Sequence, residues 1–313
     1  MALVTRLFEL IYIVFFIIII IANYRRKYRR TVMELFSIVV FALILEYLSI
    51  KTYDAYQYSS DFVLQIGSQP DNVPIVIALA WAIIIGVSMK ISDSTKIAVQ
   101  ARPFLDTLLA LTIDLSMDVI AIRIEKGLWN WKIELSNTIS FDSLLGVRYG
   151  NFIGWYFIVL IFSMMIRFGR DQFWLNDRTY GYYLSIIPFL AFIPFYISFE
   201  SIQQGKRIFY YDSYFVIVTI FLILFAVFIV LRGYDNRIIP QDGKLFPIEL
   251  IAYYSFHLFF LIALLNLDLY NTAPVIILPS IVAIFIHYIT HTSLLENYKI
   301  SQNITQEKYT MGK

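Results

Sequence analysis

The sequence predicts an all-α integral membrane protein, a polytopic bundle of about eight to nine transmembrane helices. Of its 313 residues, 59% are hydrophobic and only 15% are charged, and the mean hydropathy is +0.69. Its apolar runs approach the ~20 residues that a helix needs to cross a bilayer. No linker divides the chain, so we expect a single transmembrane domain, 1–313, with a polar C-terminal tail at 301–313.

Nine apolar segments account for the predicted helices. They lie at residues 7–23, 32–49, 73–89, 103–122, 150–166, 180–199, 213–231, 246–266 and 273–291. A basic cluster at 25–30 follows the first, which lacks a small-residue cleavage site, so we expect a retained anchor rather than a signal peptide. The second carries Glu34 and Glu46, and the sixth contains Pro188 and Pro194, which makes these two the least regular.

The basic residues predict how the chain lies in a cell membrane. One alternate set of connections, beginning with 25–30, holds 17 of the 25 Lys and Arg residues, and the other set holds eight. Basic residues are enriched in cytoplasmic connections. We therefore expect a multi-pass protein of the cell membrane with its N-terminus outside and its C-terminus cytoplasmic.

Motifs for several other chemistries are missing from the sequence. It has no cysteine, no phosphate-binding glycine loop, no HExxH and no nucleophile elbow, and its basic residues form no nucleic-acid stripe. His287 and His291 are four residues apart, a spacing that binds a metal only with a further ligand. For these two and His257 we favour interfacial or hydrogen-bonded roles, and we expect no metal.

Two aspartates stand out in the fourth predicted span. Asp114 and Asp118 lie one helical turn apart, on one face, where a carboxylate costs at least ~2.5 kcal/mol. They are either interhelical hydrogen-bonding groups or an acid/base pair in which burial and proximity disfavour double ionisation. We favour the second interpretation. Asp106, near the other end of this span, is expected only to pair with Arg102.

The predicted topology places further polar and aromatic residues at the depth of this pair. Glu46 ends the second span, and Asn151 and Trp155 begin the fifth. The longest connections, 50–72 and 123–149, lie on the same side, and loops of such length usually cover something. Aromatic residues are dense there, both as an interfacial belt and as π-faces that can stabilise a cation. They are Tyr53, Tyr56, Tyr58, Trp81, Trp129, Trp131, Trp155 and Tyr156.

The segment 46–156 resembles the carotenoid biosynthesis protein family, of the carotenoid 1,2-hydratase and bisanhydrobacterioruberin hydratase type. The family's Asp-x-x-x-Asp-Pro, Gly-x-Trp-x-Trp, Gly-Val-Pro and Asn-Phe-x-Gly-Trp patterns fall on Asp114 and Asp118, on Gly127, Trp129 and Trp131, on Gly146 and Val147, and on Asn151, Phe152, Gly154 and Trp155. Upstream, the matching positions are Glu46, Thr52, Tyr56, Tyr58 and Trp81. Val119 and Arg148 replace family prolines, and Tyr53 replaces a glycine.

The resemblance implies addition of water across the terminal C1=C2 double bond of an acyclic carotenoid through a tertiary carbocation. Asp118 or Asp114 would be the acid, and the other aspartate or Glu46 the base. Asn151 would position the water, with Trp155 and Tyr56 facing the cation. The remaining substrate-binding positions would be Tyr58, Trp81, Trp129 and Trp131. No cofactor is implied, and the expected partners are the lipid bilayer, the hydrophobic carotenoid and other carotenoid-pathway enzymes.

Three alternatives remain open at the level of sequence. A carotenoid end-group cyclase would use the same protonation and trap the cation with an alkene. An intramembrane prenyltransferase would also be helical and acidic, although it normally holds magnesium with two aspartate-rich motifs. A non-enzymatic transporter or scaffold would use the carboxylates to relay protons or to join helices.

Overall fold

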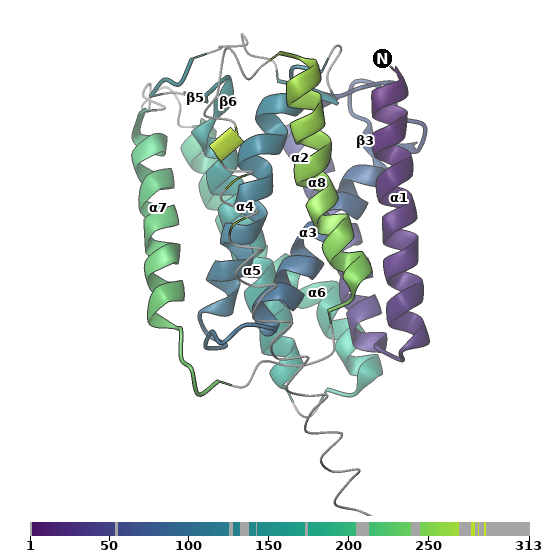
Figure 1. Ribbon diagram of the computed structural model, residues 1–313, viewed down its shortest axis with the longest axis vertical. Coiled ribbons are helices and arrows are strands. Elements are labelled where there is room, and N and C mark those ends of the chain that lie inside the picture. Colours follow the sequence, from purple (N-terminus) through teal and green to yellow (C-terminus); the bar gives the residue numbers. More distant parts are fainter. Residues whose placement is uncertain are drawn as a thin grey trace, which may run out of the picture.

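The computed structural model describes residues 2–53, 56–124, 128–131, 138–141, 143–172, 175–204, 213–238 and 245–268, with positions 277, 278, 281 and 285. In this part of the chain, eight helices form an elongated bundle (Figure 1). They are α1 (Ala2–Arg25), α2 (Arg29–Tyr53), α3 (Ile75–Asp93), α4 (Arg102–Ala121), α5 (Tyr149–Asp171), α6 (Asp177–Gln204), α7 (Ser213–Arg232) and α8 (Pro247–Asn266). The predicted all-α bundle is confirmed, and the first eight predicted spans each correspond to one helix. The predicted ninth span falls almost entirely outside the described residues.

The helices have the length and composition of membrane spans. Seven of them, all except α4, are long and apolar enough to cross a bilayer. The 20-residue α4 is as long as α8, but it carries Arg102, Asp106, Asp114 and Asp118. Charged side chains inside a membrane protein normally face the bundle interior, and all four are buried. The protein is therefore a multi-pass membrane protein in which α4 keeps its charged residues inside the bundle.

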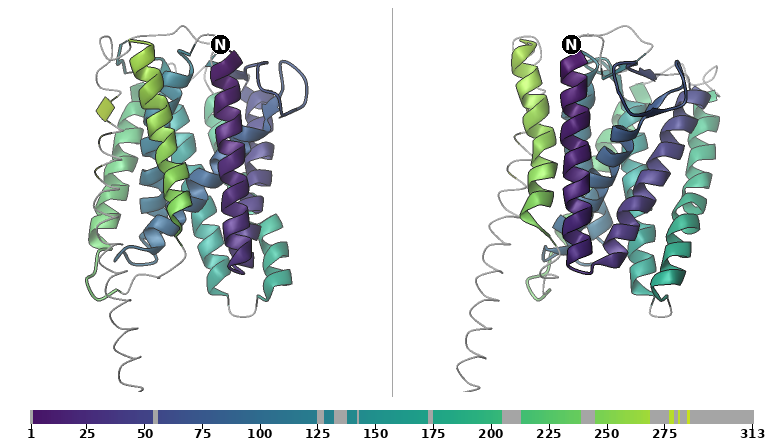
Figure 2. Two further views of the ribbon diagram at one scale, coloured as in Figure 1. Left: turned by 45° about the vertical axis from the view of Figure 1, so that its right-hand side comes forward. Right: turned by 90° about the vertical axis from the view of Figure 1, so that its right-hand side faces the viewer.

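The centre of the bundle is formed by α3, almost all of whose residues are buried. It packs against α1, α2, α4 and α8, and α4 packs against α5, α7 and α8. Figure 2 shows α1 and α8 at one edge and α6 with α2 at another. The two prolines of α6, Pro188 and Pro194, stand within a continuous helix, as neighbouring helices in membranes allow.

Three short antiparallel strand pairs lie at the end of the bundle where α1 begins (Figure 1). We call this the strand end and the other the opposite end. The pairs join β1 (Tyr56–Tyr58) to β4 (Trp129–Trp131), β2 (Gln65–Ile66) to β3 (Val73–Pro74), and β5 (Ser143–Leu144) to β6 (Val147–Arg148). The helical prediction did not include them. They fold the two long connections back over the helix ends, as loops of that length were expected to do.

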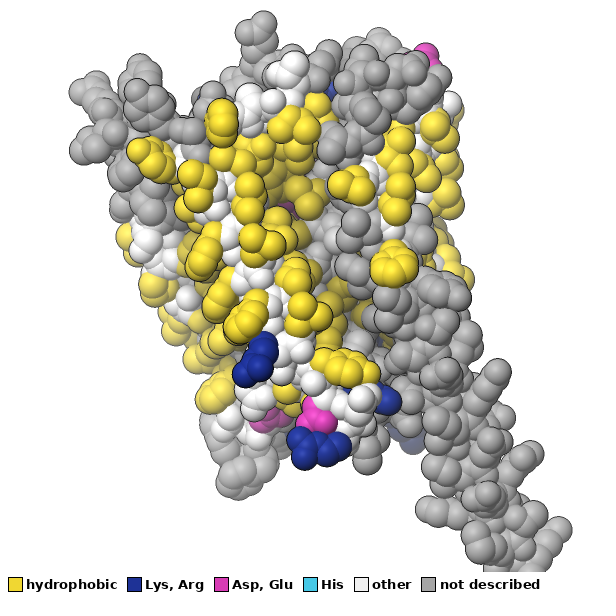
Figure 3. Space-filling view, turned by 60° about the vertical axis from the view of Figure 1, so that its left-hand side comes forward, with side chains coloured by type: hydrophobic (Ala, Val, Ile, Leu, Met, Phe, Trp, Pro, Cys, Tyr) yellow, Lys and Arg dark blue, Asp and Glu magenta, His cyan; other side chains and the backbone are white. Residues whose placement is uncertain are grey.

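The outer surface matches a lipid environment. Figure 3 shows hydrophobic side chains spread over most of one face, with Lys and Arg side chains gathered toward the opposite end. Many exposed positions are large and apolar, among them Phe221, Leu224 and Phe228 on α7. Because hydrocarbon cannot satisfy polar groups, this face is suited to acyl chains.

Candidate functional site

A small cavity lies at the strand end, enclosed by helices and roofed by strands. Its volume is about 60 Å³, enough for a few water molecules. Its polar lining comes from Glu46 on α2, Asp118 on α4 and Asn151 on α5. The rest of its wall is mainly aromatic and aliphatic: Phe8, Tyr56, Tyr58, Ile77, Ala80, Trp81, Ile84, Met117, Trp129, Trp131 and Trp155.

Glu46 is held by three donors. The Tyr56 hydroxyl donates to its Oε2 at 2.5 Å and the Tyr58 hydroxyl to the same oxygen at 2.7 Å. The indole Nε1 of Trp81 donates to Oε1 at 2.8 Å. Donors aimed at a carboxylate favour its ionised form, which burial opposes. Among the carboxyl groups at this cavity, Glu46 thus has the set of partners best suited to a negative charge.

Asp114 and Asp118 share a single amide. The Nδ2 of Asn151 donates to Asp118 Oδ2 at 2.7 Å and reaches Asp114 Oδ2 at 3.2 Å. The two carboxyl groups also lie within hydrogen-bonding reach of each other. Two neighbouring buried carboxyl groups resist carrying two negative charges, so such a pair retains a proton. Asp118 lines the cavity, whereas Asp114 is fully buried behind it.

The β1–β4 pair forms an aromatic roof over these groups. Tyr56 lies opposite Trp131 and Tyr58 opposite Trp129. Alternate residues of a strand point to the same face, so all four rings share the face toward the cavity, while Asn130 between the tryptophans is exposed. The ring centroids are 5.2 Å apart for Tyr56 and Trp131 and 6.1 Å apart for Tyr58 and Trp129.

Burial changes the acidity of the two roof tyrosines. The pKa of Tyr56 and that of Tyr58 are both raised well above 10, first by burial and then by the nearby Glu46 carboxylate. Both phenols therefore stay protonated at physiological pH and remain donors to Glu46. The roof therefore contributes hydrogen-bond donors as well as aromatic ring surface to the cavity.

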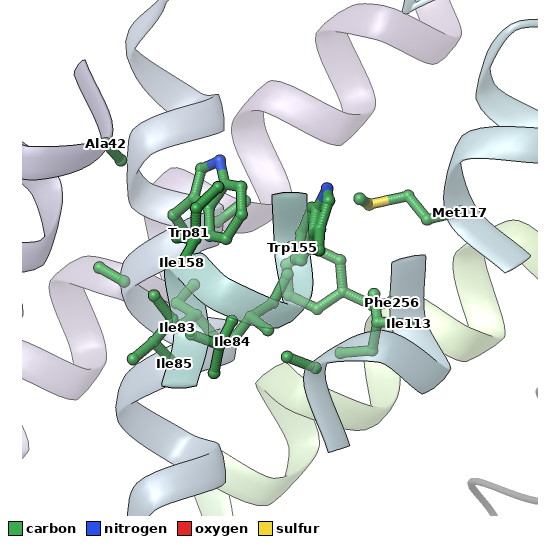
Figure 4. Packing of buried hydrophobic residues seen from close by; sticks show 14 of the residues in the cluster. Ala42, Trp81, Ile83, Ile84, Ile85, Ile113, Met117, Trp155, Ile158 and Phe256 are labelled. Carbon is green, nitrogen blue, oxygen red and sulfur yellow. The ribbon is translucent and has the colours of Figure 1, made fainter. Parts of the chain in front are cut away.

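A stacked pair of indoles forms one wall. The centroids of Trp81 and Trp155 are 3.8 Å apart, and their planes make an angle of 22°. Figure 4 shows the pair side by side, with Met117 reaching toward Trp155. Indole faces attract a positive charge, most strongly when the site is desolvated. The wall is suited to stabilising a cation that forms within reach of the carboxyl groups.

The structure brings together nearly all of the residues singled out from sequence. Glu46, Asp118 and Asn151 line the cavity, and Asp114 lies behind it in contact with Asn151 and Asp118. The aromatic lining residues from that set are Tyr56, Tyr58, Trp81, Trp129, Trp131 and Trp155. Sequence reasoning missed five apolar lining residues, Phe8, Ile77, Ala80, Ile84 and Met117, because nothing in a uniformly apolar helix marks which side faces a cavity.

The other sequence positions of interest lie elsewhere. Tyr156 is buried but does not line the cavity, and His257 is buried on α8. Gly127, His287 and His291 are outside the described residues. Among the residues that the structure describes, there is no group of three or more His, Cys, Asp or Glu side chains arranged to hold a metal ion.

Two departures from the family pattern leave the site intact. Val119, in place of a proline after Asp118, is fully buried within α4, which continues to Ala121. Arg148, the other proline position, has φ −66° and ψ 141° as the residue before α5. Proline would adopt the same φ. The backbone on which Asp118 and Asn151 depend is therefore regular at both places.

A second polar cluster occupies the opposite end. Arg167 donates to Asp106 at 2.8 Å and also to Asp93, while Arg170 bonds both Glu34, at 2.6 Å, and Asp93. Asp106 was expected to pair with Arg102, and this was wrong. Arg102 instead pairs with Asp93 at 3.2 Å, because the α3–α4 connection directs it there and α5 brings Arg167 to Asp106.

This second cluster borders a larger cavity, of about 260 Å³. Its buried cations each have a carboxylate partner, including Lys90, which lies 2.5 Å from Glu249. It lacks the stacked indoles and the aromatic roof that surround Glu46. Charges paired in this way join helices to one another, so we place the candidate chemistry at the strand end.

Comparison with known proteins identifies the family of the chain. The model of the carotenoid biosynthesis protein family matches residues 7–204, more than half of the chain and including every residue that lines the strand-end cavity. Neither a search of curated proteins nor one of solved structures gives a match. The chain belongs to the carotenoid biosynthesis protein family, and its role is in carotenoid biosynthesis.

Proposed function

We propose that the protein is a membrane-embedded carotenoid hydratase that adds water across the terminal C1=C2 double bond of an acyclic carotenoid. One observation carries the proposal: two carboxyl groups with unlike partners, Asp118 and Glu46, line one small aromatic cavity that has room for water. The predicted orientation would put this cavity toward the outer leaflet.

The first step uses the aspartate pair as the acid. Asp118, which faces the cavity, donates the proton that it shares with Asp114. The π electrons of the C1=C2 bond form the new C2–H bond, and C1 becomes a tertiary cation. The stacked faces of Trp81 and Trp155 and the ring of Tyr56 stabilise this charge. Asn151 holds the aspartates in register on α4.

The second step uses Glu46 as the base. A water molecule in the cavity attacks C1 through its oxygen, and the surplus proton passes to the Glu46 carboxylate. The product is a tertiary alcohol, and one water has been added in total. The three donors offset part of the free-energy cost of ionising Glu46 in this buried cavity. A proton must return from Glu46 to the aspartate pair before the next turnover.

The second candidate function is a carotenoid end-group cyclase. The aromatic wall would support its cation equally well, and the acid step would be the same. The two differ in what quenches the cation. Water is held by carboxylate and amide groups in the hydratase, whereas a cyclase must exclude it. The polar lining by Glu46, Asp118 and Asn151 favours water.

The test is expression in a host that accumulates an acyclic carotenoid, with mass analysis of the pigments. Hydration adds one water for each modified end, whereas cyclisation leaves the mass unchanged. Asp118→Asn should abolish the gain, while Asp171→Asn, at the exposed far end of α5, should not. If Asp114→Asn and Asp118→Asn proteins, both folded in the membrane, hydrate normally, the site is wrong.

A further inference from the structure

The seam between α1 and α8 is made of aromatic rings that reach the cavity wall. Tyr12 on α1 stacks on Phe256 of α8 with centroids 4.0 Å apart. Phe8 on α1 meets Phe259 at 5.3 Å and Phe260 at 6.1 Å. We call these five residues the α1–α8 seam. Phe8 also lines the strand-end cavity, so the seam borders the cavity directly.

At the opposite end, buried polar bonds hold the two helices together. Asn23 of α1 donates to Glu249 of α8 at 2.9 Å. Lys90 of α3 bonds both, with 2.5 Å to Glu249 and 2.8 Å to Asn23. Buried charge-assisted bonds of this kind are among the strongest in proteins. They fix the α1, α3 and α8 ends to one another.

Toward the strand end, the contacts between α1 and α8 change in kind. The Ser255 hydroxyl donates to the Tyr12 hydroxyl at 3.3 Å, and beyond it the rings of Phe8, Phe259 and Phe260 make apolar contacts. The two helix axes diverge toward the strand end in Figure 1 and in the left view of Figure 2. When two rings separate in lipid, no hydrogen bond is broken, and acyl chains take the place of the partner ring.

The other walls of the cavity are tied by polar or stacked pairs. Glu46 links α2 to Trp81 on α3, and Asn151 links α5 to the aspartates of α4. The roof strands β1 and β4 pair through their backbones. Glu9 further ties α1 to the loop below the roof by accepting the amides of Val63 and Leu64, at 2.8 and 2.7 Å. Opening any of these walls would break hydrogen bonds.

The proposed substrate requires an opening to the membrane. A long apolar polyene resides among acyl chains, and moving it through water would cost free energy in proportion to its area. The cavity of about 60 Å³ is too small for a carotenoid end group in its closed form. We propose that the α1–α8 seam is the lateral binding port for the polyene, opening about the Asn23–Glu249–Lys90 cluster; this inference rests on the proposed function.

The absence of cysteine makes the port directly testable. Tyr12→Cys/Ser255→Cys places one thiol on α1 and one on α8, at two residues whose side chains meet across the seam. Ser37→Cys/Leu184→Cys is the matched pair between α2 and α6, where the Ser37 hydroxyl donates to the Leu184 backbone carbonyl. Each full-length variant is reconstituted in liposomes with an acyclic carotenoid hydrocarbon. Uptake is followed by quenching of tryptophan fluorescence, with and without a short thiol cross-linker cleavable by reductant.

Cross-linking the seam should slow uptake by about tenfold or more relative to the same protein after reduction, as expected when a gating motion is blocked. Cross-linking the α2–α6 pair should change the uptake rate by less than about twofold. A second comparison tests for faster uptake of the polyene. Phe259→Ala should open the seam and speed uptake, whereas Phe189→Ala, a matched truncation on α6 beside Phe41, should not.

Hydration is scored separately in the same samples. If the cross-linked seam takes up polyene as fast as its reduced form, the port is wrong and the proposed function stands. If the reduced and wild-type proteins take up polyene but release no hydrated product, the proposed function is wrong and the port stands. Failure of the wild-type protein to take up polyene would overturn the port.

Discussion

The indole of Trp81 donates to Glu46 at 2.8 Å while its ring lies 3.8 Å, centroid to centroid, from Trp155. One side chain therefore couples the proposed base to the proposed cation wall. Any shift of Trp81 would disturb both, since the same indole makes both contacts. This coupling explains why a tryptophan, rather than a phenylalanine, suits the position.

Replacing Trp81 by phenylalanine tests that coupling. Trp81→Phe keeps an aromatic face but removes the donor to Glu46. A hydrogen bond to a charged group contributes about 1.5–3 kcal/mol, so kcat should fall about 10- to 100-fold. Trp129→Phe also removes an indole from the cavity, but it should lower kcat less, because the Trp129 ring meets Tyr58 rather than Glu46. Equal losses in the two variants would contradict the coupling.

Asn151 is predicted to keep the two aspartates together. Asn151→Leu removes the amide that reaches both carboxyl groups and should lower the thermal stability of the detergent-solubilised protein and its kcat. Asn151→Asp should destabilise further, because a third carboxyl group in low dielectric adds like-charge repulsion. The measurement is the midpoint of thermal unfolding of the three proteins at one pH. A more stable Asp variant than Leu variant would count against the proposed packing.

The opposite-end cluster should dominate stability without taking part in the reaction. Arg167→Met leaves Asp93 and Asp106 partly unpaired in the interior, and breaking a buried pair costs about 3–5 kcal/mol. Arg30→Gln removes a half-exposed pair with Asp177, which should cost no more than about 1 kcal/mol. The free energies of unfolding of the two variants are compared by chemical unfolding in mixed micelles. The folded fraction of both variants should retain wild-type pigment products.

The roof tyrosines predict a loss of stability at alkaline pH. The folded pKa values of Tyr56 and Tyr58 are raised above the unfolded value near 10. The folded state therefore binds more protons above that pH, so their contribution is full below pH 10 and is lost as pH rises further. Tyr56→Phe/Tyr58→Phe should flatten this decline, whereas the exposed Tyr182→Phe should leave it unchanged. Unfolding curves on both sides of pH 10 decide the matter.

Sequence alone determined the class, eight of the helices and the depth at which the polar residues lie. These follow from local quantities, because a span needs about 20 consecutive apolar residues and the order of spans sets which ends are neighbours. Glu46, Asp118 and Asn151 could therefore be placed at one level before any contact was known.

Tertiary structure decided what local pattern cannot encode. The pairing of β1 with β4 joins residues more than seventy positions apart, although the alternation in Tyr56–Tyr58 and Trp129–Trp131 was a readable signal. Whether Asp114 or Asp118 faces the cavity depends on the rotation of α4 against α5. The partner of Asp106 proved to be Arg167 rather than Arg102. Such choices depend on how helices pack, and packing is a property of surfaces that meet only in the folded chain.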